Sequence, residues 1–139
     1  MFLFNFLFFF ISCDYVEITK ENAGNYIGGP VPIFVKFYSP QCGHCQAMAE
    51  DFSEASTFFQ KDVLFGGVDC LAQHDICDEQ KVEGYPTIKL FKANSKEGIE
   101  YNGDRSTDEF VSYVQTNTGA KTHKQLSVLV NLNPYNYEK

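Results

Sequence analysis

Hydrophobic and polar positions follow two spacings along the chain, and together they predict strands and helices in alternation. Apolar runs rich in β-branched and aromatic residues predict strands at 15–18, 33–38, 63–69, 87–91 and 98–101. Helical spacing and helix-start signals predict helices from near residue 19, from about 42 to 60, near 72–81 and from about 107 to 117. This order is typical of βαβ units, so we predict an α/β fold.

Helix signals are clearest in the second and the last of these helices. One face of the second helix is predicted to be core, because apolar residues recur at Met48, Phe52, Ala55 and Phe59. The last helix is predicted to begin with capping residues, namely Ser106, Thr107 and Asp108.

Composition narrows the class of protein. A chain of 139 residues with 44% hydrophobic content can build one core but hardly two. The net charge is −7 and the lysines and arginines are scattered. A nucleic-acid surface needs a basic stripe, so we expect no nucleic-acid partner.

The first thirteen residues differ from the rest of the chain. Residues 1–13 are almost wholly apolar and carry no charged side chain, and the first acid is Asp14. The segment is too short to span about 30 Å of hydrocarbon, so we interpret it as a signal peptide. We expect no membrane association after its cleavage. The alternatives are a membrane anchor or a lipid-modified Cys13.

Two cysteines stand where a predicted strand gives way to a predicted helix. Cys42 and Cys45 are separated by Gly43 and His44, and Cys42 falls at the first turn of the helix. Unpaired backbone N–H groups and the positive end of the helix dipole stabilise a thiolate there. The pattern predicts dithiol redox chemistry, although two such cysteines taken alone leave zinc or iron binding open.

Removal of Cys13 with the signal leaves four cysteines, an even number that suits an oxidising compartment. Three pairings are formally possible, and the short separations favour Cys42 with Cys45 and Cys70 with Cys77. We interpret Cys70–Cys77 as a structural disulfide. The alternatives are a second redox pair or regulatory switch, or a metal site with His74 that lacks a recognisable fourth ligand.

Besides the dithiol, the sequence contains further motifs that together cover roughly residues 14–118. The four motifs occur in a fixed order, at residues 37–45, 68–70, 84–88 and 101–105. They resemble a catalytic domain of the protein disulfide isomerase family. The resemblance implies a thioredoxin fold, which is a central mixed β-sheet flanked by helices, with the dithiol at a helix N-terminus. It implies no metal and no cofactor.

The resemblance also implies roles for the residues of the dithiol motif. Cys42 is expected to attack a client disulfide and Cys45 to resolve the mixed disulfide. A partly protonated His44 is expected to stabilise the Cys42 thiolate, and so the reduced form, which makes the pair a better oxidant. The alternative is that His44 is only an exposed polar residue.

Two further positions match the family outside the helix. Tyr85 and Pro86 resemble its cis-proline turn, whose backbone pairs with an extended substrate; the alternative is an ordinary proline at a strand entry. Arg105 matches an arginine expected to swing toward the site and lower the pKa of the resolving thiol. Plain surface charge is the alternative for Arg105.

Two departures from the family pattern bear on chemistry. Lys36 stands where the family usually has a buried carboxylate that accepts the proton of the resolving cysteine. It is expected to act as a neutral buried base, or to favour the Cys45 thiolate electrostatically, or only to extend out of the sheet. Gln41 replaces a tryptophan, so an aromatic platform for clients is missing.

The expected function is a thiol-disulfide oxidoreductase or isomerase that forms, reduces or rearranges disulfides in client proteins of the secretory pathway. Expected partners are unfolded or disulfide-containing clients, with glutathione or a sulfhydryl oxidase to reoxidise the dithiol. The alternative is an escort or retention module that traps clients through Cys42 with little turnover.

Residues 119–139 are predicted to be a C-terminal tail of unknown role. Within it, 126–132 has the pattern of a strand, which fits an added edge strand, a partner-binding segment or the remnant of a second module. The last residues, 137–139, lack a retrieval tetrapeptide. We expect the endoplasmic reticulum lumen, with retention by a partner, or secretion.

Overall fold

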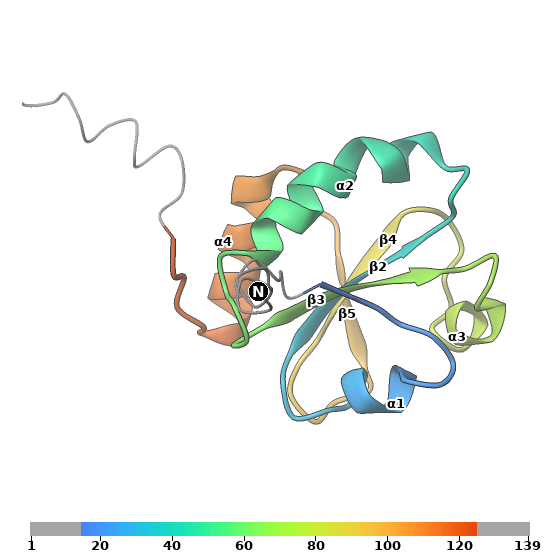
Figure 1. Ribbon diagram of the computed structural model, residues 1–139, viewed down its shortest axis with the longest axis horizontal. Helices are drawn as coiled ribbons and strands as arrows, with labels where there is room; N and C mark the ends of the chain where they lie inside the picture. Colours follow the sequence, from blue (N-terminus) through green and yellow to red (C-terminus); the bar gives the residue numbers. More distant parts are fainter. Residues whose placement is uncertain (1–14, 125–139) are drawn as a thin grey trace, which may run out of the picture.

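The computed structural model describes residues 15–124 and shows a five-stranded mixed sheet with helices on both faces (Figure 1). The elements in chain order are β1 (Tyr15–Glu17), α1 (Ala23–Tyr26), β2 (Ile33–Tyr38), α2 (Gly43–Ser56), β3 (Leu64–Asp69), α3 (His74–Glu79), β4 (Thr87–Phe91), β5 (Gly98–Tyr101) and α4 (Thr107–Thr118). The predicted signal segment 1–13 and the predicted strand 126–132 lie outside the described residues.

The sheet has the strand order β1-β3-β2-β4-β5, with β2 at its centre. β2 pairs in parallel with β3 and antiparallel with β4, while β1 runs parallel to β3 and β5 antiparallel to β4. Four of the six residues of β2 are buried, as a near-continuous apolar run predicts for a strand covered on both faces. The predicted mixed α/β sheet is confirmed.

Helix ends differ from the sequence prediction more than strand ends do. α2 ends at Ser56 and not near residue 60; turns follow it from Thr57 on, and within them Gln60 adopts a positive φ of 51°. α3 is likewise shorter than predicted, and Lys81 after it has a φ of 58°. Within the described part of the chain, no helix is long and apolar enough to cross a membrane.

Aromatic side chains fill the core between the sheet and the α2–α4 layer. Phe34 on β2 is fully buried, and its ring lies 5.4–5.9 Å from five other rings, those of Phe52, Phe65, Tyr101, Phe110 and Tyr113. Such offset and edge contacts add to the stabilisation that burial provides. The opposite face, toward α1 and α3, buries mainly isoleucine and valine side chains, together with Phe37, Phe91 and the Cys70–Cys77 disulfide.

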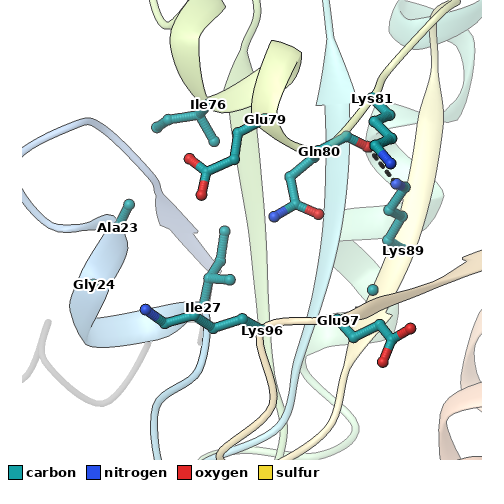
Figure 2. A pocket seen from close by; sticks show the side chains of 11 residues that line it. Ala23, Gly24, Ile27, Ile76, Glu79, Gln80, Lys81, Lys89, Lys96 and Glu97 are labelled. Atoms are coloured by element: carbon teal, nitrogen blue, oxygen red, sulfur yellow. Dashed lines mark hydrogen bonds between the residues drawn. The ribbon is translucent and has the colours of Figure 1, made fainter.

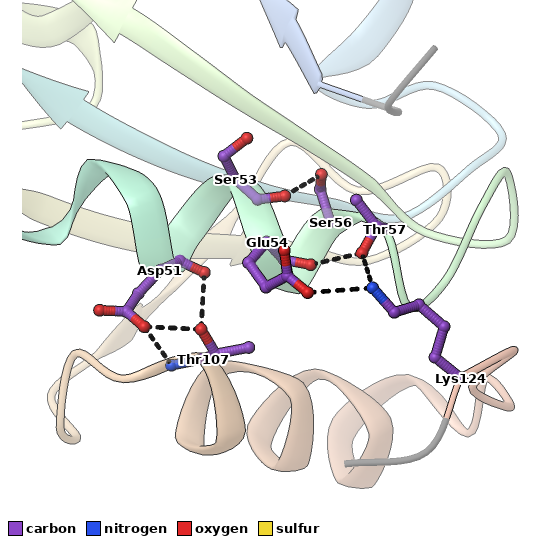
Figure 3. Close-up of polar contacts among 7 residues, drawn as sticks. All are labelled: Asp51, Ser53, Glu54, Ser56, Thr57, Thr107 and Lys124. Carbon is purple, nitrogen blue, oxygen red and sulfur yellow. Dashed lines mark hydrogen bonds and ion pairs between the residues drawn. The ribbon is translucent and has the colours of Figure 1, made fainter. Parts of the chain in front are cut away.

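Polar contacts tie α4 and the residues after it to α2 (Figure 3). The Asp51 carboxylate accepts hydrogen bonds from the backbone N–H of Thr107, at 3.1 Å, and from its hydroxyl, at 2.6 Å. It therefore places a negative charge at the N-terminus of α4. Ser106 caps the same helix, accepting from the backbone N–H of Glu109 as predicted. Beyond α4, the Lys124 amine lies 3.0 Å from a Glu54 carboxylate oxygen.

We expect Phe34→Ala to lower the free energy of unfolding by about 3–5 kcal/mol, because it opens a cavity that five aromatic rings cannot close. Urea denaturation monitored by circular dichroism measures the change. Ile99→Thr is the matched control, since Ile99 is exposed on β5 and a β-branched substitution there costs about 0.5 kcal/mol or less. Equal losses in the two variants would contradict this account of the core.

Candidate active site

Cys42 lies in the turn that joins the central strand to α2. β2 ends at Tyr38, and the backbone N–H of Cys42 donates to the Ser39 carbonyl at 3.0 Å. Cys42 has extended dihedral angles and is the N-cap of α2, where its sulfur accepts the backbone N–H of Cys45 at 3.1 Å. A sulfur atom thus takes the place that a capping oxygen usually has.

The two thiols of the motif differ in exposure. Neither is disulfide-bonded in this structure; Cys42 is partly exposed, whereas Cys45 is 4% exposed and packs in the core face of α2. A client disulfide can therefore reach Cys42 directly. Cys45 is shielded, and it can attack only a sulfur that is already held at Cys42.

Opposite electrostatic effects act on the two sulfurs. Burial raises the pKa of the Cys42 thiol, whereas hydrogen bonds from Cys45, a hydrogen bond from the His44 backbone N–H and the charge of Arg105 lower it. The lowering effects prevail, so the pKa of Cys42 lies below its ordinary value. Burial raises the pKa of the Cys45 thiol to about 11, and its hydrogen bond with Cys42 and the Cys42 charge act in the same direction. The exposed sulfur is the stronger nucleophile at neutral pH, because the thiolate is the reactive form.

The remaining residues of the motif lie open to solvent. Gly43 and His44 are exposed, and a Cβ at Gly43 would meet no atom within 4 Å. Arg105, exposed in the loop between β5 and α4, was predicted to act on the resolving thiol; in this arrangement its charge lowers the pKa of Cys42. Its swing toward Cys45 stays a prediction.

Lys36 projects from β2 beneath α2 into a box of aromatic rings. Its amine lies 5.3–5.5 Å from the ring centroids of Tyr15, Tyr38 and Phe52, which suits a cation–π contact. The Glu17 carboxylate joins two walls of the box, since it accepts hydrogen bonds from the Tyr15 hydroxyl at 3.2 Å and the Tyr38 hydroxyl at 2.6 Å. The half-buried Lys36 amine is thus enclosed by three aromatic rings.

A glycine on the neighbouring strand makes room for this box. Gly67 on β3 is the register partner of Lys36, and a Cβ on Gly67 would collide with the Tyr15 hydroxyl. Sequence reasoning missed the box, because its walls come from three separate elements. The Gly66–Gly67 doublet inside a predicted buried strand was the available signal, since glycine there marks close approach by another group.

The charge of Lys36 is coupled to the resolving thiol. Burial lowers the pKa of Lys36, while the charges of Glu17 and Cys45 raise it, and burial prevails. In return, the Lys36 charge opposes the upward shift of the Cys45 pKa. The sequence-based alternative in which Lys36 only extends out of the sheet does not describe this enclosed position.

The predicted cis-proline turn opens at the same end of the sheet as the dithiol. The Tyr85–Pro86 peptide bond is cis, and Thr87, which follows it, is the register partner of Phe37 near the end of β2. Tyr85 is exposed and lines a cleft of about 330 Å³ with charged neighbours, including Lys81, Glu83 and Glu100. Gln41 is also exposed, with its backbone N–H bonded to the Ser39 hydroxyl.

The second cysteine pair lies at the same end of the sheet. Cys70 and Cys77 form a disulfide, both are buried, and the Cys70 backbone N–H donates to the Tyr38 carbonyl at 2.8 Å. The pairing agrees with the sequence prediction. Among residues 15–124, no group of three or more histidine, cysteine or acidic side chains could hold a metal ion.

A larger cavity of about 470 Å³ lies away from this chemistry, between α1, α3 and the start of β5 (Figure 2). Ile27 and Ile76 line it together with charged side chains of both signs. Lys89 spans part of it, donating to the Gln80 carbonyl at 2.6 Å. No residue of either cysteine pair lines this cavity, so we place the active site at the dithiol and not there.

We expect alkylation of Cys42 in the reduced protein to reach half its maximal rate below about pH 8.5, the ordinary thiol value. A lowered pKa leaves thiolate present at lower pH, whereas Cys45 reacts only in more alkaline solution. Timed iodoacetamide labelling with peptide mass spectrometry measures both thiols. The urea-unfolded chain is the control, and a folded midpoint equal to its midpoint would contradict the assignment.

Comparison with known proteins agrees with this geometry. A family model described as Thioredoxin matches residues 14–116. A probable protein disulfide-isomerase ER-60 of Schistosoma mansoni is 39% identical over 118 residues, covering 82% of this chain and 24% of that protein. Protein disulfide-isomerase 1 of Dictyostelium discoideum is 35% identical over 130 residues, covering 88% of this chain and 36% of that protein.

Solved structures show the same fold. The J-Trx1 fragment of ERdj5 has a TM-score of 0.69 at 25% identity, covering 75% of this chain and 50% of that one. Human ERp44 in a zinc-bound form has a TM-score of 0.67 at 28% identity, covering 73% of this chain and 30% of that one. The chain thus spans only part of each of these relatives. It belongs to the thioredoxin family, as a thioredoxin-like domain of the protein disulfide isomerase type.

Proposed function

We propose that the protein is a thiol-disulfide oxidoreductase or isomerase that acts on disulfides of client proteins. The observation that carries the proposal is the asymmetry of the dithiol: Cys42 is accessible with a lowered pKa, and Cys45 is buried with a raised one. Two successive thiol-disulfide exchange steps require one accessible thiolate that attacks the client and a second thiol that attacks the resulting mixed disulfide.

In the first step, the Cys42 thiolate attacks a client disulfide. A bond forms between Cys42 Sγ and one client sulfur, and the other client sulfur leaves as a thiolate. In the second step, the Cys45 thiolate attacks Cys42 Sγ, a Cys42–Cys45 disulfide forms, and the client leaves reduced. The reverse sequence oxidises a client dithiol, and attack by a second client thiolate on the mixed disulfide rearranges the client.

Lys36 serves the second step as a fixed positive charge. Cys45 must lose its proton in a buried position, where a thiolate is disfavoured. The amine in its aromatic box opposes that penalty. His44 supports the Cys42 thiolate beside it, and Tyr85 and Pro86 offer backbone for an extended client.

Oxidising activity also needs an electron acceptor, which we propose to be glutathione disulfide or a sulfhydryl oxidase. The site of action is the endoplasmic reticulum lumen or the exterior, with residues 1–13 as the signal peptide. The name of one relative, probable protein disulfide-isomerase ER-60, agrees with that setting. Both sulfurs of Cys70–Cys77 are buried, which supports its role as a structural disulfide.

An escort or retention function is the second candidate. The observation that favours it is the raised pKa of Cys45, because a slow resolving step leaves clients bound to Cys42. The two candidates differ in one measurable quantity, which is the lifetime of the mixed disulfide.

Refolding of a small protein with mispaired disulfides tests the proposal. We expect Cys42→Ser to lower catalysed refolding to the background rate. Cys45→Ser is expected to accumulate a mixed disulfide at Cys42, detected as an intact mass, because the resolving thiol is missing. If the wild-type chain accumulates as much mixed disulfide as Cys45→Ser, the escort function is correct instead.

Variants of Lys36 test its role in resolution. We expect Lys36→Met to slow client release from a preformed Cys42 mixed disulfide about tenfold, because the buried Cys45 thiolate loses the positive charge that stabilises it. Lys36→Arg keeps a permanent charge and is expected to release client within about threefold of wild type. Stopped-flow release of a fluorescent peptide measures both rates. A slow Arg variant would mean that Lys36 accepts a proton.

A further inference from the structure

Glu17 is an exposed acid on the edge strand β1, yet both oxygens of its carboxylate accept a tyrosine hydroxyl. Oε1 accepts from Tyr15 at 3.2 Å, and Oε2 accepts from Tyr38 at 2.6 Å. Tyr15 lies on β1 and Tyr38 ends β2, and β3 separates these two strands in the sheet. One surface carboxylate thus connects two strands that do not pair with each other.

Strand register explains how this carboxylate reaches across β3. Glu17 on β1 and Lys36 on β2 are both register partners of Gly67, so the three residues lie on one face of the sheet. Because Gly67 has no side chain, the Tyr15 hydroxyl fills the place that a Cβ would take there. The two tyrosines therefore contact the Glu17 carboxylate with their hydroxyls and the Lys36 amine with their rings.

Hydrogen bonding to Glu17 makes the tyrosine rings better partners for a cation. A phenol hydroxyl that donates to a carboxylate is polarised, so more negative charge lies on the ring face that attracts an ammonium group. Burial, the hydrogen bond to Glu17 and the Glu17 charge raise the pKa of Tyr38, and the charge of Asp69 on β3 acts in the same direction. The Tyr38 hydroxyl therefore keeps its proton, and remains a donor, at neutral and moderately alkaline pH.

The negative charge of Glu17 also opposes the effect of burial on Lys36. Burial lowers the pKa of Lys36, whereas the charges of Glu17 and Cys45 raise it. Cys45 is negative only as a thiolate, so Glu17 is the lasting source of this support. The titratable groups around the amine are Glu17 and Tyr15 from β1, Tyr38 from β2 and Cys45 from α2, while β3 presents Gly67 at this level. Without the Glu17 carboxylate, the Lys36 amine would lose its proton at a lower pH.

We propose that Glu17 is a positioning residue for the resolving step: its carboxylate holds the two tyrosines around the Lys36 amine and keeps that amine charged. This deepens the proposed function and rests on the part given there to Lys36. In the step concerned, Cys45 loses its proton to solvent, its thiolate bonds to Cys42 Sγ, and the client sulfur leaves as a thiolate. Loss of the Glu17 charge alone would favour a nearby thiolate, so slower resolution without Glu17 reports a change at Lys36.

Titration of Lys36 tests the electrostatic part of the proposal without a client. NMR of the reduced protein labelled with ¹³C-lysine follows the amine, and Lys36→Arg identifies its signal. We expect Glu17→Gln to move the midpoint of Lys36 to lower pH. Glu21→Gln is the matched control, because it removes one exposed carboxylate between β1 and α1, and it is expected to leave the midpoint unchanged. A Lys36 midpoint that is the same in Glu17→Gln and wild type overturns the proposed role.

Release of a fluorescent peptide from a preformed Cys42 mixed disulfide tests the chemical part. We expect Glu17→Gln to slow release about threefold at pH 7, half in free energy of the effect of Lys36→Met. At pH 8.5 the slowing approaches the full tenfold, because the charge of Lys36 is lost as the pH rises through its lowered pKa. In the Lys36→Met background, Glu17→Gln is expected to change release less than twofold. A slowing that is independent of pH, or one that persists in that background, overturns the proposal.

Tyr38→Phe is a second variant, which decides the question if Glu17→Gln does not fold by circular dichroism. It keeps the ring and the Glu17 charge, removes the 2.6 Å hydrogen bond, and is expected to slow release about twofold. Attack of Cys42 on a small aromatic disulfide is expected to keep its wild-type rate in both variants, and an equal slowing of attack and release overturns the positioning role. A wild-type chain that forms no mixed disulfide or releases no client instead overturns the proposed function.

Discussion

The pairing of β2 with strands on both of its sides is the constraint on which the rest of the structure depends. Hydrogen bonds to β3 and β4 fix where β2 ends, and its burial on both faces fixes which residues face each helical layer. The end of β2 sets the position of Ser39, whose carbonyl binds the Cys42 backbone N–H. The reactive sulfur is therefore positioned by the central, buried strand of the sheet.

The different reactivity of the two thiols follows from how deeply each sulfur is buried. Cys42 and Cys45 are one helical turn apart, yet one sulfur receives hydrogen bonds at the helix N-terminus and the other is enclosed by the core. Burial penalises a thiolate, whereas backbone N–H groups stabilise it. The enclosed Lys36 amine counters part of that penalty for Cys45, so a positive charge occupies a position where a carboxylate was expected to receive a proton.

Local pattern predicted most of the fold, because the apolar runs 33–38, 87–91 and 98–101 are the observed strands. Helix ends were predicted less well, since the positive φ of Gln60 and Lys81 depends on how each chain segment must turn to bury its neighbours. The Cys42–Cys45 motif could be found in the sequence itself, whereas the cis bond before Pro86 was predicted only from the family resemblance, because most X–Pro bonds are trans. The box around Lys36 could not, because it needs Tyr15 and Phe52 from elements far apart in the sequence.

The last described residues after α4 are held at the end of the sheet opposite the dithiol. The His123 backbone N–H donates to the Phe58 carbonyl at 2.7 Å, and the Lys124 amine lies 4.7 Å from the Phe58 ring centroid. Both contacts lie beside the start of β3, at the opposite end of the sheet from Cys42, and β1 begins at that end as well (Figure 1). Tyr15 and Lys124 thus both lie away from the dithiol end of the sheet, so the contacts that hold residues 123 and 124 leave the turn that carries Cys42 uncovered.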